Sequence, residues 1–556
     1  MAVELAASRL LAPYFSSSLP VWSVIIGLIM AAMAFGNYRG GRLADRAVEK
    51  GSDAPLYRRM LIAAIWIAVI PLVGKYLIVA LAAVAAVVAG SQVIVVGSIL
   101  SCLLLFTAPM VLLGMVSPFL VRVASGDKTT PGVILSPESG ANTGAVIGSI
   151  YAWGTLGSIL GTFLASFVTI PDAGVARTFL FFAAALAALV LIHELATHTR
   201  WWPAAVATVC CLGLLATPLG ANYAFWERGI LYQGESSYNY LQVSQDDYAR
   251  YFSTNVLFGV QSLLPRQYLE SGQGAGQPTG EYYDGMIGAC GLMAGFKPGK
   301  PIHALMLGLG TGTCPALLQQ ALPGSTCTGV ELDSKIVDVA RDYFALTPRD
   351  CQVVVGDGRS YIEQHDEKYD LIMVDAYQDV SVPFYMASKE FYTLAASRLA
   401  PGGVLVCNVN MGTRNNSAVT GALAATMSSV FGRVYAYNPP GTSNTLLYVA
   451  PGGSLARLDA SLRACAAAEE APGASAGVQA SAGLMQQCIQ GVADGAAPIH
   501  STARVLTDDR APTELLANQA LDNLIAEQRA AAQKQVKAAG GGVRGWWRYL
   551  QTLLAQ

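Results

Sequence analysis

The chain has 556 residues, of which 53% are apolar and only 13% are charged, and its formal net charge is −2. This balance is too apolar for an ordinary soluble protein, so membrane-spanning segments are expected. The small net charge, without a long basic run, gives no electrostatic support for nucleic-acid binding. Charges are sparse between residues 61 and 200 and become frequent from Glu227 onward, so the chain divides near residue 225.

The first 225 residues are predicted to form a polytopic transmembrane domain of six or seven helices. A span needs about 20 apolar residues. Five tracts are clear candidates: 20–38, 92–121, 143–170, 178–193 and 202–219. The tract 60–90 could form one kinked helix or a hairpin of two, because Pro71 and Gly74 lie in its middle. The stretch 1–17 lacks the order of a signal peptide and is expected to be interfacial or half-spanning.

Basic residues after the first span orient this domain. They are Arg39, Arg42, Arg46, Lys50, Arg58 and Arg59. Cytoplasmic loops carry an excess of Lys and Arg, so this loop is expected in the cytoplasm. Seven crossings would then place the soluble half in the cytoplasm as well.

The ten cysteines predict neither a metal site nor a disulfide framework. No two of them form a CxxC pair, the spacing typical of zinc and redox motifs. Several lie in apolar runs, where cysteine packs as a small hydrophobic side chain. We therefore expect reduced, structural cysteines and no bound metal.

The segment that begins at residue 301 has the order of a nucleotide-binding α/β fold. An apolar run at 303–307 ends in GLGTG (308–312); a helical run follows, and then a second strand that ends in Glu331. Glycines let a backbone pass close to a ligand, and an acid at the next strand end can accept hydrogen bonds from ribose hydroxyls. A tight turn between a strand and a helix that binds no ligand could have the same glycine pattern.

Two further strand ends favour a ligand. The strand 351–355 runs into Asp357 and Gly358, and the strand 369–374 ends in Asp375. Ligands of doubly wound sheets bind outside the carboxyl ends of the strands. Four successive strand ends with glycines or acids therefore predict a nucleoside site. The GxGxG turn is tighter than the GxGxxG of dinucleotide oxidoreductases, which disfavours that class.

These motifs resemble the spermidine synthase (polyamine aminopropyltransferase) family in its membrane-fused form. The matching text includes LMLGLGTGT, GVELD and VVVGDGRSYI. The most specific stretch is YDLIMVDAYQDVSVPFYMASKEFYTLAASRLAPGGVLVCNV, and VLTDDRAPTELL matches near the C-terminus. In the first half, ELAASRLLAPYF and GGRLADR resemble the N-terminal spans of fused forms.

The resemblance implies an α-helical polytopic membrane domain (1–225), then a small β-rich lid (226–300) and a Rossmann-like catalytic domain of the S-adenosylmethionine-dependent transferase type (301–520). A C-terminal helix (521–556) would follow, and its Trp-rich end could dock on the membrane interface. The protein would lie in the inner or plasma membrane with its catalytic domain in the cytoplasm, and it would form a homodimer.

The resemblance also assigns roles to the acids. Asp375 would be the general base, because a primary amine is protonated at neutral pH and must lose a proton before it displaces a thioether from a sulfonium carbon. Asp379 would hold the acceptor's nitrogen. A cationic donor and a polycationic acceptor both suit an acid-lined pocket. The products would be a longer polyamine and methylthioadenosine, and no prosthetic group or metal is needed.

The other expected contacts form two sets. The co-substrate, decarboxylated S-adenosylmethionine or S-adenosylmethionine itself, would contact Gly308, Gly310, Thr311, Gly312, Glu331, Asp357, Gly358, Pro383 and Asn239. The acceptor amine would contact Asp379, Tyr377, Tyr238, Gln261, Tyr283 and Asp284. Aromatic rings can enclose an alkylammonium by cation–π contacts, although ordinary strand packing would also explain these tyrosines.

Departures from the family pattern leave the transferred group open. Thr311 stands where the family has an acid that binds the donor's terminal ammonium. The His and Glu of the acceptor region are replaced in part by Asp284, and Asp379 follows Asp375 by four residues instead of three. The alternatives are another S-adenosylmethionine-using enzyme, a methyltransferase or lyase, and a polyamine transporter with a nucleoside-binding domain. The isolated charge of Lys75 would support the last.

Overall fold

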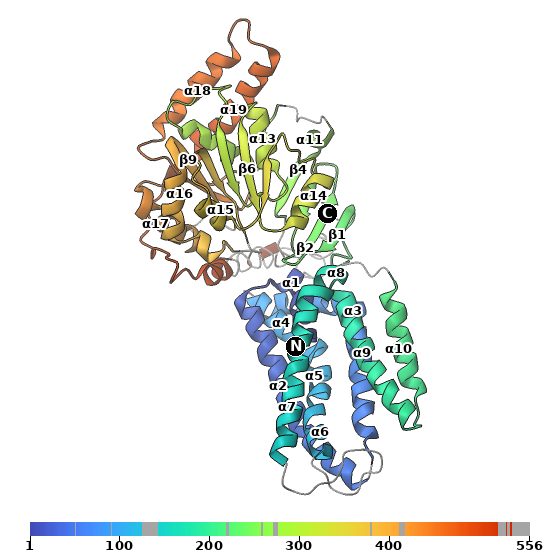
Figure 1. Cartoon of the computed structure of the whole chain (residues 1–556). Helices are drawn as coiled ribbons and strands as arrows, with labels where there is room; N and C mark the ends of the chain where they lie inside the picture. The colour runs from blue at the N-terminus through green and yellow to red at the C-terminus, as the bar shows by residue number, and fades with distance from the viewer. Residues whose placement is uncertain are drawn as a thin grey trace. The chain divides into compact units, whose positions relative to one another are not determined.

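The computed structural model describes residues 1–50, 52–89, 92–124, 143–217, 222–256, 260–270, 276–377, 381–410 and 418–520, together with 530, 534, 535 and 537. The chain forms two compact units. Unit 1 comprises Met1–Glu227, Gln233–Tyr240 and Asn255–Leu257, and unit 2 comprises Arg228–Tyr232, Leu241–Thr254 and Phe258–Gln556. Figure 1 labels their elements.

Unit 1 is built mainly of helices. In chain order they are α1 (Ala2–Phe15), α2 (Leu19–Glu49), α3 (Ala54–Val88), α4 (Val93–Leu105), α5 (Thr107–Gly114), α6 (Val116–Ala124), α7 (Thr143–Leu164), the π-helical turn η2 (Ala165–Thr169), α8 (Ile170–Ala173), α9 (Val175–Ala196) and α10 (Trp202–Leu215). Five stretches of the described chain are long and apolar enough to cross a membrane: Leu19–Ala47, Ala54–Ala86, Thr107–Ala124, Gly144–Ala173 and Val175–Ala196. The predicted count of six or seven spans is therefore not confirmed.

The helix breaks decide between the two alternatives for one apolar tract and divide another that was expected to be continuous. The tract 60–90 lies, as far as Val88, in the single helix α3, with Pro71 inside it; a proline removes only one helical hydrogen bond, and long apolar helices tolerate it. The tract 92–121 is instead divided into three helices at Phe106 and Met115. The expected span at 202–219 forms α10, which has 14 residues.

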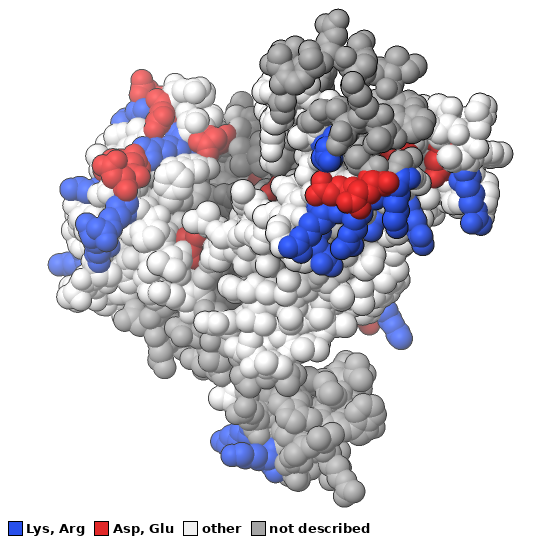
Figure 2. Space-filling view, turned by 90° about the horizontal axis from the view of Figure 1, so that it is seen from below, with Lys and Arg blue, Asp and Glu red and all other residues white. Residues whose placement is uncertain are grey.

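Charged side chains of unit 1 gather at helix ends. The basic residues Arg39, Arg42, Arg46, Arg58 and Arg59 lie toward the end of α2 and at the start of α3. Arg122 of α6 forms an ion pair of 3.1 Å with Asp45 of α2. Figure 2 shows charged side chains in separate groups, with wide uncharged areas between them. The side of a membrane on which these groups lie stays a prediction.

Lys75, the isolated charge of α3, is held by its own neighbours. Its Nζ donates to the carbonyl oxygen of Asn222 at 3.1 Å and lies 5.2 Å from the ring centre of Tyr76. The ammonium is therefore engaged by a carbonyl and a ring, and this geometry gives the transport hypothesis no added support.

A four-stranded sheet precedes the larger sheet of unit 2 along the chain. Its strands are β1 (Ile230–Glu235), β2 (Tyr240–Gln245), β3 (Ala249–Ser253) and β4 (Ser262–Pro265), in the order β1-β2-β3-β4. The Asp246 carboxylate closes the β2–β3 turn by accepting the N–H groups of Tyr248 and Ala249, both at 2.8 Å. A small β-rich element thus lies within the expected range, and its action as a lid stays a prediction.

Unit 2 is centred on an eight-stranded sheet in the order β12-β10-β11-β9-β8-β5-β6-β7. The parallel strands are β5 (His303–Leu307), β6 (Thr326–Glu331), β7 (Gln352–Val355), β8 (Tyr369–Val374) and β9 (Leu399–Val409). The antiparallel strands are β10 (Tyr435–Tyr437), β11 (Thr445–Val449) and β12 (Ala497–Pro498). The strand order reverses between β5 and β8, so ligands are expected outside the carboxyl ends of these two strands.

Helices cover both faces of this sheet (Figure 1). The α-helices described in this part of the chain are α11 (Arg266–Glu270), α12 (Tyr282–Gly288), α13 (Thr313–Ala321), α14 (Ser334–Tyr343), α15 (Gly358–Gln364), α16 (Lys389–Arg398), α17 (Ala418–Phe431), α18 (Ala456–Glu469) and α19 (Ala476–Gly495). Alternate residues of β5 pack into two hydrophobic cores, one on each face of the sheet. Ala304 and Met306 belong to the core that contains residues of α12 and α13, whereas Leu305 and Leu307 belong to the core that contains residues of α15, α16 and α17. The predicted Rossmann-like architecture is confirmed. The segment 521–556 lies outside the described residues, apart from four isolated positions.

Candidate active site

The glycine loop after β5 touches the end of β8. Gly308, Gly310 and Gly312 have φ angles of 86°, 56° and 83°, in the left-handed region that favours glycine. A Cβ added at Gly308 would lie 2.3 Å from the carbonyl oxygen of Asp375. The Asp375 N–H donates to the Leu307 carbonyl at 2.8 Å. Loop and acid are therefore joined through their backbones at the point where the strand order reverses.

Glu331, at the end of β6, faces the same loop. Its Oε2 accepts the Gly310 N–H at 2.9 Å and its Oε1 accepts the Asp333 N–H at 3.1 Å. Burial raises the pKa of this carboxyl to about 7, although both hydrogen bonds oppose the shift. A carboxylate can accept about four hydrogen bonds in all, so ribose hydroxyls can be added to the present set.

Asp357 begins helix α15. Its Oδ1 accepts the Ser360 N–H at 2.8 Å, which makes it an N-cap. A Cβ added at Gly358 would lie 3.2 Å from Cε of Met386. Met386 ends the turn η4 (Phe384–Met386), and its N–H donates to the carbonyl of Pro383 at 2.9 Å. Three of the expected adenosyl contacts, Asp357, Gly358 and Pro383, thus come from two adjoining turns.

The carboxylate of Asp375 is held by two side chains from other elements. Tyr282 of α12 donates its hydroxyl to Oδ2 at 2.9 Å, and Asn408 of β9 donates its side-chain amide to Oδ1 at 2.7 Å. Asn444 in turn donates to the amide oxygen of Asn408 at 2.9 Å. Burial raises the pKa of Asp375 to about 6, and the two hydrogen bonds limit that rise because they favour the charged form.

Asn408 is not among the site residues expected from the sequence, whereas Tyr282 directly precedes the expected acceptor contacts Tyr283 and Asp284 and lies in the same stretch of the family pattern. Asn408 is a polar residue near the end of the apolar strand GVLVCNV, which is the available sequence signal. Its position follows from the register of β8 and β9, where Val374 pairs with Cys407. The next residues along the two parallel strands, Asp375 and Asn408, are therefore neighbours.

Thr311 lies in a buried cluster of hydroxyl groups. Its Oγ1 is 2.5 Å from Oγ of Ser262 and 3.3 Å from Oγ1 of Thr313. Tyr283 donates its hydroxyl to Ser262 at 3.1 Å and accepts the Leu263 N–H at 3.1 Å. This cluster is neutral, so it links the loop to β4 without offering a negative charge to a ligand.

Two other residues expected at the site, Asp284 and Tyr377, make hydrogen bonds to nearby groups of the protein. Asp284 accepts the backbone N–H groups of Thr279 and Gly280 and the Thr279 hydroxyl, at 2.7–2.8 Å. Tyr377 donates its hydroxyl to the carbonyl of Asn408 at 2.9 Å. Their contacts with the acceptor amine stay a prediction.

The remaining expected contacts lie in the smaller sheet or beyond the described chain. Gln261 donates its N–H to the carbonyl of Phe252 at 2.8 Å. Tyr238 and Asn239 belong to unit 1, where both N–H groups donate to Ser236 Oγ. Asp379 lies outside the described residues.

Comparison with known proteins places this site in a family. The model of the spermine/spermidine synthase domain matches residues 283–445, which include the glycine loop, Glu331 and Asp375. A probable polyamine aminopropyl transferase from Bifidobacterium longum is 38% identical over 341 residues, which cover 61% of this chain and 72% of that relative. The chain belongs to the spermidine synthase (polyamine aminopropyltransferase) family.

Two more distant similarities accompany this assignment. A polyamine aminopropyltransferase from Vibrio vulnificus is 34% identical over 149 residues, or 26% of this chain and 48% of that relative. The solved structure of a probable spermidine synthase from Corynebacterium glutamicum shares 22% identity over 39% of this chain and 79% of its own, with a TM-score of 0.34, which adds nothing to the fold described above. The family resemblance in the motifs is confirmed. As a member of the aminopropyltransferase family, the protein is an alkyl-group transferase, and polyamines are the substrate class.

Proposed function

We propose that this aminopropyltransferase is anchored in a membrane and transfers the aminopropyl group of decarboxylated S-adenosylmethionine to a polyamine or another small amine. Methylthioadenosine would be the second product. The observation that carries this proposal is Asp375, a carboxylate fixed by Tyr282 and Asn408 beside the glycine loop. Its pKa of about 6 leaves it ionised at neutral pH yet basic enough to accept a proton.

Different residues of the chain would bind the donor and accept the proton. The glycine loop, Glu331 and the Asp357 turn would bind the adenosyl part of the donor, with the reacting carbon toward Asp375. Asp375 would take a proton from the acceptor's ammonium, and the amine nitrogen would then attack the methylene carbon on the sulfonium. The carbon–sulfur bond breaks, and its electron pair stays on sulfur as a neutral thioether.

A second candidate is another S-adenosylmethionine-using activity, and the neutral cluster around Thr311 favours it. An aminopropyl donor ends in an ammonium, and the hydroxyls of Thr311, Ser262 and Tyr283 offer that group no ion pair. Product analysis separates the two candidates. The full-length protein would be given decarboxylated or intact S-adenosylmethionine, each with a panel of diamines and polyamines.

The expected result is methylthioadenosine together with an amine that is longer by one aminopropyl unit, from the decarboxylated donor only. S-adenosylhomocysteine with a methylated product would instead show methyl transfer. Methylthioadenosine without a longer amine would show lyase chemistry. Either result would overturn the proposed reaction while leaving the adenosyl site in place.

Membrane anchoring and assembly are tested separately. The five apolar stretches predict that the protein stays in the membrane fraction after an alkaline carbonate wash. Its release would argue against spanning helices. Protease digestion of right-side-out and inverted vesicles would test the proposed cytoplasmic side, and cross-linking in membranes would test the proposed homodimer.

The pH dependence of kcat/KM tests the role of Asn408. In the wild type, activity should be lost as the pH falls through about 6, because Asp375 becomes protonated. Asn408→Ala removes a hydrogen bond that favours the charged form, so the pKa of Asp375 should rise and the acidic limb should move up by about one pH unit. Asn444→Ala is the control, since its amide donates to Asn408 rather than to Asp375. An acidic limb unchanged in Asn408→Ala would show that this amide does not tune the base.

A further inference from the structure

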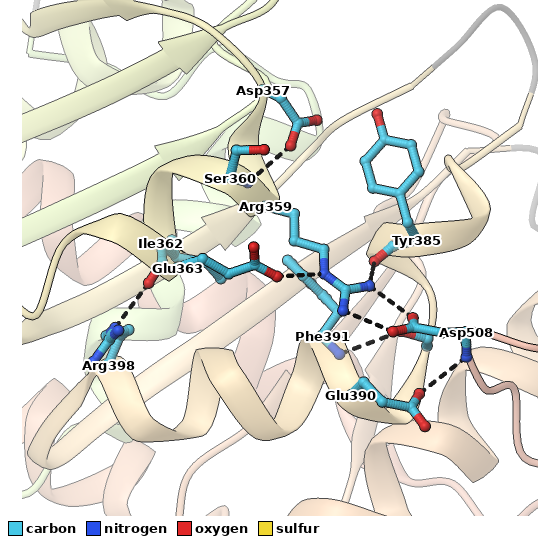
Figure 3. Close-up of polar contacts among 11 residues, drawn as sticks. Asp357, Arg359, Ser360, Ile362, Glu363, Tyr385, Glu390, Phe391, Arg398 and Asp508 are labelled. Carbon is cyan, nitrogen blue, oxygen red and sulfur yellow. Dashed lines mark hydrogen bonds and ion pairs between the residues drawn. The ribbon is translucent and has the colours of Figure 1, made fainter.

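Arg359 binds three separate parts of unit 2. It is the second residue of α15, next to the Asp357–Gly358 turn. Its Nη1 and Nη2 donate to the two carboxylate oxygens of Asp508 at 2.6 and 2.7 Å, and Nη1 also donates to the Tyr385 carbonyl at 2.8 Å. Its Nε donates to Glu363 at 3.0 Å. Figure 3 shows the guanidinium between Asp508 and Tyr385. We call Arg359, Asp508 and the Tyr385 carbonyl the Arg359 clamp.

Asp508 is itself anchored by the chain around it. Its N–H donates to Glu390 of α16 at 3.0 Å. The neighbouring Leu506 is buried, and its carbonyl accepts the Lys389 N–H at 2.9 Å. The C-terminal segment around Asp508 therefore provides a fixed carboxylate against the side of the Rossmann-like core.

The clamp connects two turns that, in the proposed function, bind the adenosyl group. Tyr385 belongs to the turn η4, which follows Pro383, and Arg359 follows Asp357 and Gly358. The same two turns also meet where Met386 packs on Gly358. A shift of Arg359 would move both turns relative to each other.

We propose that Arg359 is a positioning residue that holds the Asp357 turn and the Pro383 turn at the spacing required by the donor's adenosyl group. A planar guanidinium can bind a carboxylate through two parallel hydrogen bonds while it donates to a carbonyl. Lysine keeps the positive charge but presents three donors from one atom and cannot reproduce this fork. The inference rests on the proposed function in one respect only, which is the identity of the ligand that the two turns bind.

Arg398 provides a matched control within the same pair of helices. It has a similar buried side chain, and its Nε donates to the carbonyl of Ile362 of α15 at 2.9 Å. Nη1 forms an ion pair with Asp366. Arg398 thus ties α16 to α15, but at the end of α15 away from Asp357 (Figure 3). Arg398→Lys should weaken the fold locally without changing the adenosyl turns.

The test compares full-length Arg359→Lys, Asp508→Asn, their double variant and Arg398→Lys. We expect Arg359→Lys and Asp508→Asn to raise the dissociation constant of methylthioadenosine and the KM of the donor about tenfold, because small misplacements of binding groups are costly. The KM of the amine should stay within about twofold. The double variant should be little worse than either single change, since both break the same contact. Arg398→Lys should leave methylthioadenosine binding within about twofold.

The possible outcomes distinguish a failure of the positioning role from a failure of the proposed reaction. Unchanged methylthioadenosine binding in Arg359→Lys, or an equal loss in Arg398→Lys, would overturn the positioning role. A wild-type protein that binds methylthioadenosine but transfers no aminopropyl group would overturn the proposed reaction, while the binding comparison would still test the clamp.

Discussion

Asp375→Asn should lower kcat for aminopropyl transfer by about 10²–10⁴-fold, the range over which a positioned general base contributes. Asparagine has nearly the same shape and can remain hydrogen-bonded to Tyr282 and Asn408, but it cannot take a proton from the acceptor. Methylthioadenosine binding should change by less than about threefold, because Glu331 and the glycine loop are intact. Turnover would be measured on the full-length protein at pH 8, where the wild-type carboxyl is ionised.

The stability of the same variant has a definite sign. The pKa of Asp375 is raised in the folded protein to about 6 from an ordinary value of 3.8. A carboxyl with a raised pKa costs stability progressively as the pH rises from about 4 to about 6. Asp375→Asn should therefore melt no lower than the wild type at pH 8. Asp459→Asn, an identical change on the exposed surface of α18, is the control for both measurements. Near-normal turnover in Asp375→Asn would assign the proton to another group.

Gly308→Ala should be the most damaging single-methyl change for the structure of the site. The added Cβ would lie 2.3 Å from the Asp375 carbonyl oxygen and 2.7 Å from Cα of Ala376. Both are backbone atoms at the end of a central strand, so they cannot turn aside. The clash adds to the left-handed strain at φ 86°, and a total cost above about 4 kcal/mol is expected. The melting temperature should fall by roughly 10 °C.

Gly295→Ala separates strain from collision. Gly295 has a similar φ of 68°, but an added Cβ there would have nothing within 4 Å. Strain alone should cost about 1–2 kcal/mol, which corresponds to a few degrees of melting temperature. Equal, small shifts in the two variants would mean that the glycine loop can retreat from Asp375.

The parts of the site that follow one another along the chain could be predicted from the sequence. The glycine loop, Glu331, Asp357 and Asp375 each end a recognisable strand, and parallel strands bring such ends to one edge. The hydrogen bonds that Asp375 accepts from Asn408 and Tyr282 could not be predicted, since these residues are 33 and 93 positions away from it. Their approach depends on the order and register of strands. The hydrogen bonds that Asp284 accepts from Thr279 and Gly280 were likewise not expected, and its contact with the acceptor stays a prediction.

Hydropathy located the apolar tracts but could not locate the helix ends within them. Pro71 was compatible with either a kinked helix or a hairpin turn, and it lies inside the single helix α3. The breaks at Phe106 and Met115 interrupt a tract whose composition continues unchanged. Helix ends in such tracts depend on tertiary packing, which the apolar pattern does not encode.

The two units alternate along the chain, so the catalytic part cannot be separated from the helices by a single cut. The strand end Gln233–Tyr240 groups with the helices although it follows residues of unit 2. Within it, Glu235 accepts the Val175 N–H at the start of α9 at 2.7 Å and the Tyr223 hydroxyl at 2.5 Å. A shortened protein that began at Arg228 would retain Glu235 and lose both donors. It would remove two of the hydrogen bonds that hold the Glu235 carboxylate in the intact chain. Trimming away the helices is therefore not a neutral route to a soluble catalyst.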